Sequence, residues 1–356
     1  MYGFHSSKGM GMMNRMPKSK EPPTDVPPPV QSSYAFREFR KKLEADGWFR
    51  AHWRGEIQKL VPWAACVLIA KQLSRFTNPL AALGAIFFFA VSNTLSGWLA
   101  HDYVHGRSPF SMAMRGFGEL VGGMSTSWWS AKHNMHHALT NEIGYDEDVA
   151  LEPAIYLWQP DPKIDSPFRK WQHLYWPIPF SVLFLYWRFD SIKFVLKHKK
   201  MGEAGRLAAH WAMALAWLPA KTVFLGIWLS GLITATIVTV THQSEEIFIK
   251  DTLRKYDFCE AQFRSTRDAM CSNWFSDMLW GGMQWQLEHH LFPTMPRYKY
   301  KAVHPLLREW SREVGLDFRT SGEMEILVQN VNQLKKMSEL PAVEGNPDST
   351  PIFKQI

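Results

Sequence analysis

Three short boxes concentrate histidine in this chain: HDYVH at 101–105, HNMHH at 133–137 and QLEHH at 286–290. Together they hold half of the 14 histidines present among 356 residues. On a helix, residues three and four apart share a face, so each box is expected to present its polar side chains in one direction. Neutral imidazole is the commonest metal ligand, and one zinc ion takes about four ligands at most, so this many histidines indicates two metal ions. The predicted box ligands are His101, His105, His133, His136, His137, His289 and His290.

A metal-free interpretation is the alternative for each box taken alone. A single HxxxH pattern is more often chance or a surface pair, and HxxHH by itself fits either interpretation. The first two boxes follow the apolar and aromatic runs LSGWLA and STSWWS, so both are expected to start at a membrane boundary. Three such boxes brought to one membrane face favour metal binding over any structural role.

Apolar segments must position these boxes. Residues 80–100 carry no charge, and at about 1.5 Å per residue they are long enough to cross a hydrocarbon core of roughly 30 Å. Asn78-Pro79 predicts a tight turn between this segment and the shorter apolar run before it, which has Lys71 near one end. The apolar block 207–241 is broken at Pro219 and Lys221 and is too long for one span. We therefore predict an all-α integral membrane protein with four transmembrane helices in two hairpins, at about 58–77, 80–100, 207–220 and 222–241.

Two hairpins return the chain to the side of the membrane on which it starts. The N-terminal part, residues 101–206 and the part after 242 then share one face, and nearly all Lys and Arg residues lie there, which makes that face cytosolic. A helical cytosolic cap is expected to hold the boxes, with both termini in the cytosol. Segment 174–187, LYWPIPFSVLFLYW, is predicted either as an interfacial or re-entrant helix or as a buried helix of the cap.

The remaining boundaries follow from composition. Residues 1–33 are rich in proline and poor in apolar residues, which predicts a disordered cytosolic tail. Residues 34–340 form the predicted membrane domain, and 341–356 a C-terminal tail. Cys66, Cys259 and Cys271 fit neither a zinc pattern nor a disulfide framework, which favours a reducing compartment.

Charge and aromatic content indicate the kind of partner. The formal net charge is +7, and the chain has 17 tryptophans and 23 phenylalanines. No recognised nucleic-acid motif accompanies the positive charge, so a nucleic-acid partner is not expected. Aromatic residues are typical of membrane interfaces, and basic residues of the face that meets anionic lipid. Membrane lipid is therefore the expected partner.

Around the boxes, from about Phe36 to Met337, the sequence resembles the membrane fatty acid desaturases. The likeness rests on HDYVHG, on WWSAKHNMHHALTN followed by DEDVALEP, and above all on LWGGMQWQLEHHLFPTMPR. Glutamine at the first position of the last box is similar to the front-end desaturases, which insert a double bond between an existing one and the carboxyl end. The resemblance implies four transmembrane helices with a cytosolic cap, and a pair of non-haem iron ions that use O2 and two electrons.

The resemblance also implies the partners. Many eukaryotic front-end desaturases carry an N-terminal cytochrome b5 domain with an HPGG motif, whereas this sequence has a proline-rich segment there. Electrons are therefore expected from a separate cytochrome b5 and its NADH-dependent reductase, unless the chain is a shortened form. The expected substrate is a fatty acyl-CoA or an acyl-lipid, and the expected location is the endoplasmic reticulum membrane.

Two further residues are predicted to belong to the site. His242 follows the last apolar run in ATIVTVTHQSEE. A lone histidine at a helix end is more often a cap, but related desaturases have a histidine at this exit, and the boxes are one short of four histidines per iron; His242 is therefore predicted as the eighth ligand. Gln286 is a poor iron ligand, and we expect it to shape the site through a hydrogen bond or a water, facing the same way as His289 and His290.

Acidic and aromatic residues beside the boxes are candidates for supporting roles. Carboxylates can orient ligand imidazoles, and those beside the boxes are Asp102, Asp146, Asp148 and Glu288. A cap or helix-dipole role is the alternative for each. An acyl chain needs a long apolar tunnel, which the tryptophans near the boxes are candidates to line, with interface anchoring or core packing as the alternative. These tryptophans are Trp128, Trp129, Trp280 and Trp285.

Three other functions compete with front-end desaturation. The same scaffold can support hydroxylation of an acyl, sphingoid or sterol chain, or desaturation of a sphingolipid long-chain base. A non-catalytic membrane metal-binding or transport protein would also bring histidines near a bilayer. Such a protein is expected to place polar ligands near the middle of its spans, whereas these boxes lie outside the predicted spans.

Overall fold

The computed structural model describes residues 32–249 and 256–349, which are mostly helical. The predicted tail 1–33 lies outside these residues, except for Ser32 and Ser33, which begin the first described helix. The α-helices are α2 (Ser32–Ala45), α3 (Trp53–Leu73), α4 (Pro79–His105), α5 (Pro109–Gly122), α6 (Thr126–Ala138), α7 (Gln172–Tyr175), α8 (Pro177–Lys197), α9 (Met201–Trp217), α10 (Ala220–Val240), α11 (Phe258–Ser265), α12 (Trp274–Trp280), α13 (Gln286–Leu291), α14 (Tyr300–Glu313) and α15 (Glu323–Glu339), with short 3-10 helices η1 (Arg169–Trp171) and η3 (Arg297–Lys299).

The expectation of an all-helical protein needs one small correction. Strands β1 (Asp268–Met270) and β2 (Thr320–Gly322) pair in parallel, with Asp268 opposite Thr320. The extended segment after α11 lies beside the extended segment before α15, and the backbone N–H and C=O groups of the two segments form hydrogen bonds with each other. The pair fixes the position of Asp268 near the third histidine box.

Both predicted helical hairpins are present in the structure. Helices α3 and α4 pack together through a short turn at 74–78, and only Leu218 and Pro219 separate α9 from α10. Asn78 caps α4, because its Oδ1 accepts from the Ala81 amide at 2.8 Å and Pro79 follows at the first helical position. Helix α4 continues to His105, so the first histidine box forms its last turns.

Two helices have the length and apolar composition needed to cross a membrane, among those the structure describes: α4 and α10. Helices α3 and α9 are not among these two, so the four-span topology stays a prediction. Helices α3, α4, α8, α9 and α10 are among those that expose large apolar side chains, a surface that soluble proteins avoid when it is extensive. Examples, one each from α3, α4, α8, α9 and α10, are Leu68 (57% exposed), Leu83 (63%), Val182 (47%), Met213 (56%) and Leu225 (39%).

Segment 174–187 lies mostly in α8, a helix longer than the segment itself. One face of α8 packs against α10 and buries Phe180 and Phe184, while Val182 and Tyr186 are exposed on the other. A fully buried helix of the cap is therefore wrong for this segment. The exposed apolar face fits the interfacial alternative.

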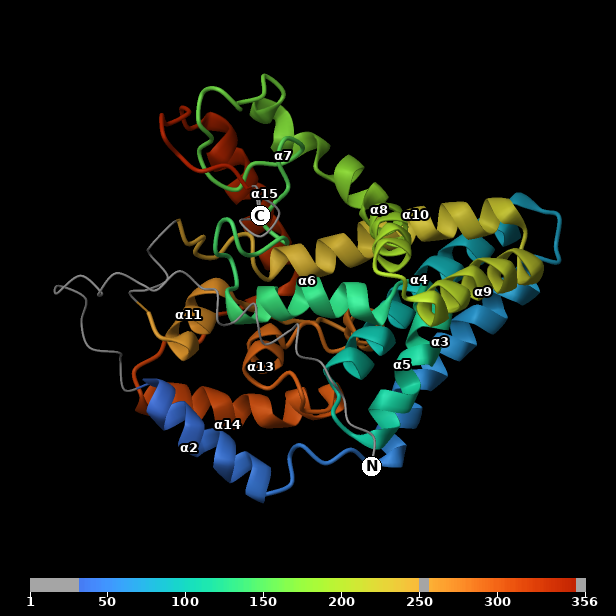
Figure 1. Cartoon of the computed structure of the whole chain (residues 1–356), viewed down its shortest axis with the longest axis horizontal. Coiled ribbons are helices and arrows are strands. Elements are labelled where there is room, and N and C mark those ends of the chain that lie inside the picture. Colours follow the sequence, from blue (N-terminus) through green and yellow to red (C-terminus); the bar gives the residue numbers. More distant parts are fainter. Residues whose placement is uncertain (1–31, 250–255, 350–356) are drawn as a thin grey trace.

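The remaining helices build a cap around α6 (Figure 1). Figure 1 shows α3, α5 and α9 on one side of the molecule and α2, α11, α13 and α14 on the other, with α6 between them. Ser125 begins α6, since its Oγ accepts from the Trp128 amide at 3.0 Å. An aromatic core in which Phe36, Phe292 and Trp310 are buried joins α2, α13 and α14. The end of α4, the length of α6, the exit of α10 and α13 converge inside this cap.

The described part of the predicted C-terminal tail packs against a loop of the cap. Pro347 O accepts from Trp158 Nε1 at 2.9 Å, and the Val343 amide donates to Pro160 O at 2.9 Å. The Ser349 amide donates to Glu152 at 3.0 Å. The segment 341–349 is therefore held to loop 152–160, while 350–356 lie outside the described residues.

Candidate metal centre

The eight predicted histidines meet in two groups, and all eight are buried. Within each group the candidate ligand atoms lie within 4.8 Å of one another. The five-histidine cluster joins α4, α6 and α13, and its members are His101, His105, His133, His137 and His289. The three-histidine cluster joins α6, the exit of α10 and α13, and its members are His136, His242 and His290.

The first box presents His101 and His105 to one cluster, as the sequence predicted, but the second and third boxes do not point in one direction. His136 and His137 are neighbours on α6 but belong to different clusters, and so do His289 and His290 on α13. Consecutive residues on a helix are about 100° apart, so a helix lying between two sites supplies both. The second and third boxes therefore divide between two clusters, and the distribution is five and three instead of four and four.

The five-histidine cluster has the nitrogen spacing of a metal shell. His133 Nε2 lies 2.8 Å from His101 Nε2 and 3.1 Å from His137 Nε2. Two nitrogens that each lie about 2.1 Å from one metal at right angles are about 3 Å apart. The Nε2 atoms of His105 and His289 are buried without a hydrogen-bond partner among the described residues. Buried polar atoms normally have partners, so a metal ion fits this cluster.

The three-histidine cluster is oriented by hydrogen bonds on the far side of each ring. His136 Nδ1 lies 2.8 Å from Asp146, His242 Nδ1 lies 2.9 Å from the Ser265 carbonyl, and His290 Nδ1 lies 2.8 Å from Gln262 Oε1. Each acceptor fixes the ring proton on Nδ1. Each Nε2 is then left with its lone pair for a metal, the usual arrangement of a ligand histidine.

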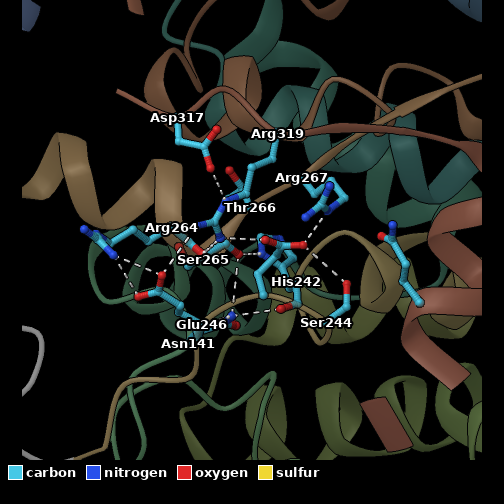
Figure 2. A network of polar contacts seen from close by, with 12 residues as sticks. Asn141, His242, Ser244, Glu246, Arg264, Ser265, Thr266, Arg267, Asp317 and Arg319 are labelled. Carbon is cyan, nitrogen blue, oxygen red and sulfur yellow. Dashed lines mark hydrogen bonds and ion pairs between the residues drawn. The ribbon is translucent and has the colours of Figure 1, made fainter. Parts of the chain in front are cut away.

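His242 lies just beyond α10, on a turn held by several polar contacts (Figure 2). Asn141 Nδ2 donates to the His242 carbonyl at 2.9 Å, and the Arg267 amide donates to the Thr241 carbonyl at 3.0 Å. Figure 2 shows Arg264, Arg267 and Arg319 around this turn. Arg267 and Arg319 pair with the buried carboxylate of Glu245, which lies three residues after His242. No motif in the sequence indicated this support.

Gln286 belongs to the three-histidine cluster. Its side-chain Nε2 lies 2.7 Å from His242 Nε2 and 3.2 Å from His290 Nε2, while its Oε1 is buried without a partner among the described residues. Gln286 thus faces the same cluster as His290 but not the cluster of His289, which corrects the expectation that it faces both. With both rings protonated on Nδ1, the Gln286 NH2 group is the donor toward the Nε2 atoms of His242 and His290.

Of the four predicted orienting carboxylates, Asp146 makes the contact. Asp148 lies 3.5 Å from His136 Nδ1, beyond a good hydrogen bond, and also pairs with Lys132. Asp102 turns away from the cluster to Lys59 and Arg297, at 3.1 Å and 2.9 Å.

Glu288 pairs with His304 at 2.8 Å, outside both clusters. Glu288 precedes His289 and His290 on α13 but points in a different direction, because consecutive residues on a helix are about 100° apart. Asp268 lies 3.3 Å from the same His304 ring and also accepts from the Leu287 amide at 2.9 Å. The group of Asp268, Glu288 and His304 therefore joins β1, α13 and α14.

The electrostatics of the site favour neutral imidazole. Burial, together with neighbouring histidines, holds the pKa values of His133, His137, His289 and His290 well below the ordinary value. Burial is also the main cause that lowers the pKa of His242 to about 3. These rings are therefore uncharged at neutral pH, the form in which histidine binds a metal.

A cavity of about 640 Å³ borders both clusters. His101, His133 and His289 line it from the five-histidine cluster, and His136 and His242 from the other. Its apolar wall comes from α4, α6, α8 and α10, with Trp98, Val104, Trp128, Trp129, Phe184 and Val238. Of the predicted tunnel tryptophans, Trp128 and Trp129 line this cavity. Trp280 and Trp285 instead pack in the hydrophobic core, the alternative considered for them.

A helical protein with two membrane-length helices, two groups of buried histidines and an apolar cavity that borders both is a membrane-associated oxidoreductase of the histidine-box class. The fatty acid desaturase family model matches residues 77–322, and this range includes all three boxes and His242. The chain therefore belongs to the fatty acid desaturase family.

Known relatives extend the similarity over most of the chain. An acyl-lipid 8-desaturase of Rebecca salina is 31% identical over 93% of this chain and 82% of its own length. A Delta(6)-fatty-acid desaturase of Caenorhabditis elegans is 29% identical, covering 86% of this chain and 75% of the relative. A Delta(5) fatty acid desaturase of the same organism is 28% identical, covering 88% and 76%.

Proposed function

We propose that this desaturase holds two iron ions and introduces a cis double bond between an existing double bond and the carboxyl end of a polyunsaturated acyl chain. The observation that carries the proposal is the meeting of eight buried histidines in two clusters on one apolar cavity. The relatives named as Delta(5), Delta(6) and 8-desaturases support the position of the new bond.

In this proposal, each cluster binds one iron ion. The five-histidine cluster holds one iron, and the three-histidine cluster, with Gln286 beside it, holds the other. When bound, the iron pair supplies the oxidising power of O2, with two electrons, to remove two hydrogens from adjacent methylenes. Thiolate-free nitrogen ligands of this kind suit iron as well as zinc, copper or nickel. The Asp146 carboxylate, hydrogen-bonded to His136, and the buried Gln286 amide beside His242 and His290 keep the second site rigid.

The cavity walls determine which methylenes reach the clusters. Trp98, Val104 and Val238 form apolar contacts that suit an acyl chain and exclude water. The fatty acyl substrate enters as an acyl-CoA or an acyl-lipid. The depth of the apolar end beyond the histidines then sets the position of the new double bond.

Electron supply and topology complete the proposal. A separate cytochrome b5, reduced by its NADH-dependent reductase, docks on the basic cytosolic face of the cap. Added salt is expected to slow this encounter by screening. Helices α3, α4, α9 and α10 span the endoplasmic reticulum membrane, and the clusters and both termini face the cytosol. Activity that is unchanged in membranes lacking any cytochrome b5 would contradict the electron route.

Product analysis in yeast tests the reaction. Cells that express the chain and are fed linoleate or a longer unsaturated acid should form a new double bond on its carboxyl side, seen by gas chromatography with mass spectrometry. The purified protein should contain about two irons per chain, as two ligand clusters require. Oxygenated products alone would make the chain a hydroxylase, and desaturation confined to sphingoid bases would change the substrate class.

A cavity variant with a matched control tests the assignment of the acyl site. Val238→Trp fills the cavity from α10 and replaces no histidine, so it should abolish conversion while iron content stays normal. Leu225→Trp places the same bulk on the same helix at an exposed position and should leave conversion unchanged. Normal turnover by Val238→Trp would place the acyl chain elsewhere.

A further inference from the structure

A second cavity of about 180 Å³ reaches the five-histidine cluster. His101, His105 and His289 form its inner wall. Its other walls come from the loop before α3, the first turns of α3 and α5, and residues 293–296. His101 and His289 border the larger cavity as well, so the five-histidine cluster lies between the two cavities. We call the smaller one the polar vestibule.

The walls of the polar vestibule are charged and held in place. Lys59 lies 2.8 Å from Glu56 and 3.1 Å from Asp102, and Arg297 holds Asp102 from the other side at 2.9 Å. Ser108 and Ser111, with their hydroxyl oxygens 2.9 Å apart, line the start of α5. Such walls disfavour an acyl chain, because burying charged groups against hydrocarbon is costly.

The polar vestibule has room for water and an opening to solvent. Ala51 and Arg107 line it and are exposed. Each water takes up about 30 Å³ in the liquid, so several waters fit, with polar partners on most sides. The larger cavity also has charged residues near His133, namely Lys132 and Asp148, but apolar side chains such as Trp98, Val104 and Trp129 make up most of its wall.

The proposed reaction requires such a route. For each double bond, a –CH2–CH2– unit, O2, two electrons from the one-electron carrier and two protons become –CH=CH– and two waters. The acyl chain fills the larger cavity during this step and closes that path. Protons must reach the cluster, and waters must leave it, by a path that the acyl chain does not occupy.

We propose that the polar vestibule is the path by which water and protons exchange between the five-histidine cluster and the cytosol while an acyl chain occupies the larger cavity. The inference rests on the proposed function, because it takes the acyl chain to fill the larger cavity. It assigns Ser111 and Thr294 as wall residues of a passage for small polar solutes.

Thiol labelling tests the path without any metal. In membranes, Ser111→Cys should react with a small charged methanethiosulfonate reagent, followed at that peptide by mass spectrometry. A fluorinated, unreactive acyl analogue should leave this labelling unchanged, but it should protect Val238→Cys in the larger cavity. Protection of Ser111→Cys by the analogue, or no labelling of it at all, would overturn the inference.

Azide binding tests the path in the iron-loaded chain. With the acyl analogue bound, azide should still reach the oxidised iron of the wild-type protein, as seen by absorbance after rapid mixing. Ser111→Trp and Thr294→Trp should slow it by about tenfold or more, because a close-packed indole leaves no gap of water size. Met112→Trp, at the exposed neighbouring position of α5, should bind azide at the wild-type rate.

The outcomes separate this inference from the proposed function. The polar vestibule would be ruled out as a path if the acyl analogue blocks azide binding in the wild type. It would also be ruled out if neither Ser111→Trp nor Thr294→Trp slows azide binding. A chain without iron or without a desaturated product would instead refute the proposed function, and the thiol labelling would still decide whether the polar vestibule is open.

Discussion

Asp146→Asn should weaken the metal site of the three-histidine cluster while leaving the other site intact. The Asp146 carboxylate is buried and accepts three hydrogen bonds, from His136 Nδ1 at 2.8 Å, from the Asn141 amide at 2.8 Å and from the Asp148 amide at 2.9 Å. Burial by itself raises the pKa of Asp146, but the facing His136 ring and the Asn141 amide outweigh it and hold the pKa below its ordinary value. The carboxylate is therefore ionised and orients His136.

The expected magnitude follows from these contacts. Asparagine has nearly the same shape but only one side-chain acceptor oxygen, so in either orientation its NH2 group meets a buried donor. Leaving one buried donor unsatisfied costs about 1–3 kcal/mol. Removing such an orienting partner typically lowers metal affinity about 10- to 100-fold, or roughly 1.4–2.7 kcal/mol. The ligand nitrogens of the five-histidine cluster make no contact with Asp146.

Iron retention against increasing chelator measures the effect. Asp146→Asn should lose about one of two irons per chain at about 10- to 100-fold lower chelator than the wild type, and retain the other. Asp148→Asn is the matched control, because its carboxylate lies 3.5 Å from His136 Nδ1 and is 30% exposed. If Asp146→Asn retains both irons as tightly as the wild type, the assigned orienting role is wrong.

Three further predictions follow from the site. His242→Ala should lower iron from about two to about one per chain and abolish activity, while the protein still inserts and folds. His137→Ala, in the other cluster, should have the same effect. Normal iron content and turnover in His242→Ala would mean that His242 has a structural role. Gln286→Ala should lose activity, whereas Gln286→His, which offers a ring nitrogen to the same cluster, should retain iron. Full activity of Gln286→Ala would show that Gln286 does not shape the site. Although burial lowers the pKa of His304, hydrogen bonds to Asp268 and Glu288 raise it to about 9. The pKa of His304 in the unfolded chain is about 6.5, so its protonation stabilises the folded state fully below that pH, and this stabilisation is lost as pH rises through about 9. The melting temperature should therefore fall over this pH range, and it should fall less in His304→Gln.

Much of the site could be predicted from the sequence because helical spacing is local. The interval between His101 and His105, or between His133 and His137, places two imidazoles on one side of one helix whatever that helix packs against. The apolar run before His242 likewise predicted a helix that ends just before this histidine, and the structure ends α10 at Val240. The four-span topology and the boundaries of the membrane domain stay predictions.

The supporting contacts were harder to predict because they join distant parts of the chain. Gln262 and Ser265 of α11 orient His290 and His242, although no spacing in the sequence connects them. Asp102 and Glu288 lie beside box histidines in the chain yet pair with Arg297 and His304 instead. Sequence neighbours on a helix point about 100° apart, so adjacency to a ligand predicts little about contact with it.

The sequence by itself determined which residue types form the candidate metal site and on which helices, since both depend on periodicity within a few turns. Only the tertiary structure decided how they divide: α6 and α13 lie between two sites, so His136 and His290 turn to one cluster while His137 and His289 turn to the other. The shapes of the two cavities were also beyond the sequence, because a cavity is the space that packed elements leave unfilled: α4, α6, α8 and α10 around the larger one, and α3, α4, α5 and residues 293–296 around the polar vestibule. Their walls come from side chains far apart in the chain, and no linear pattern records the distance between them.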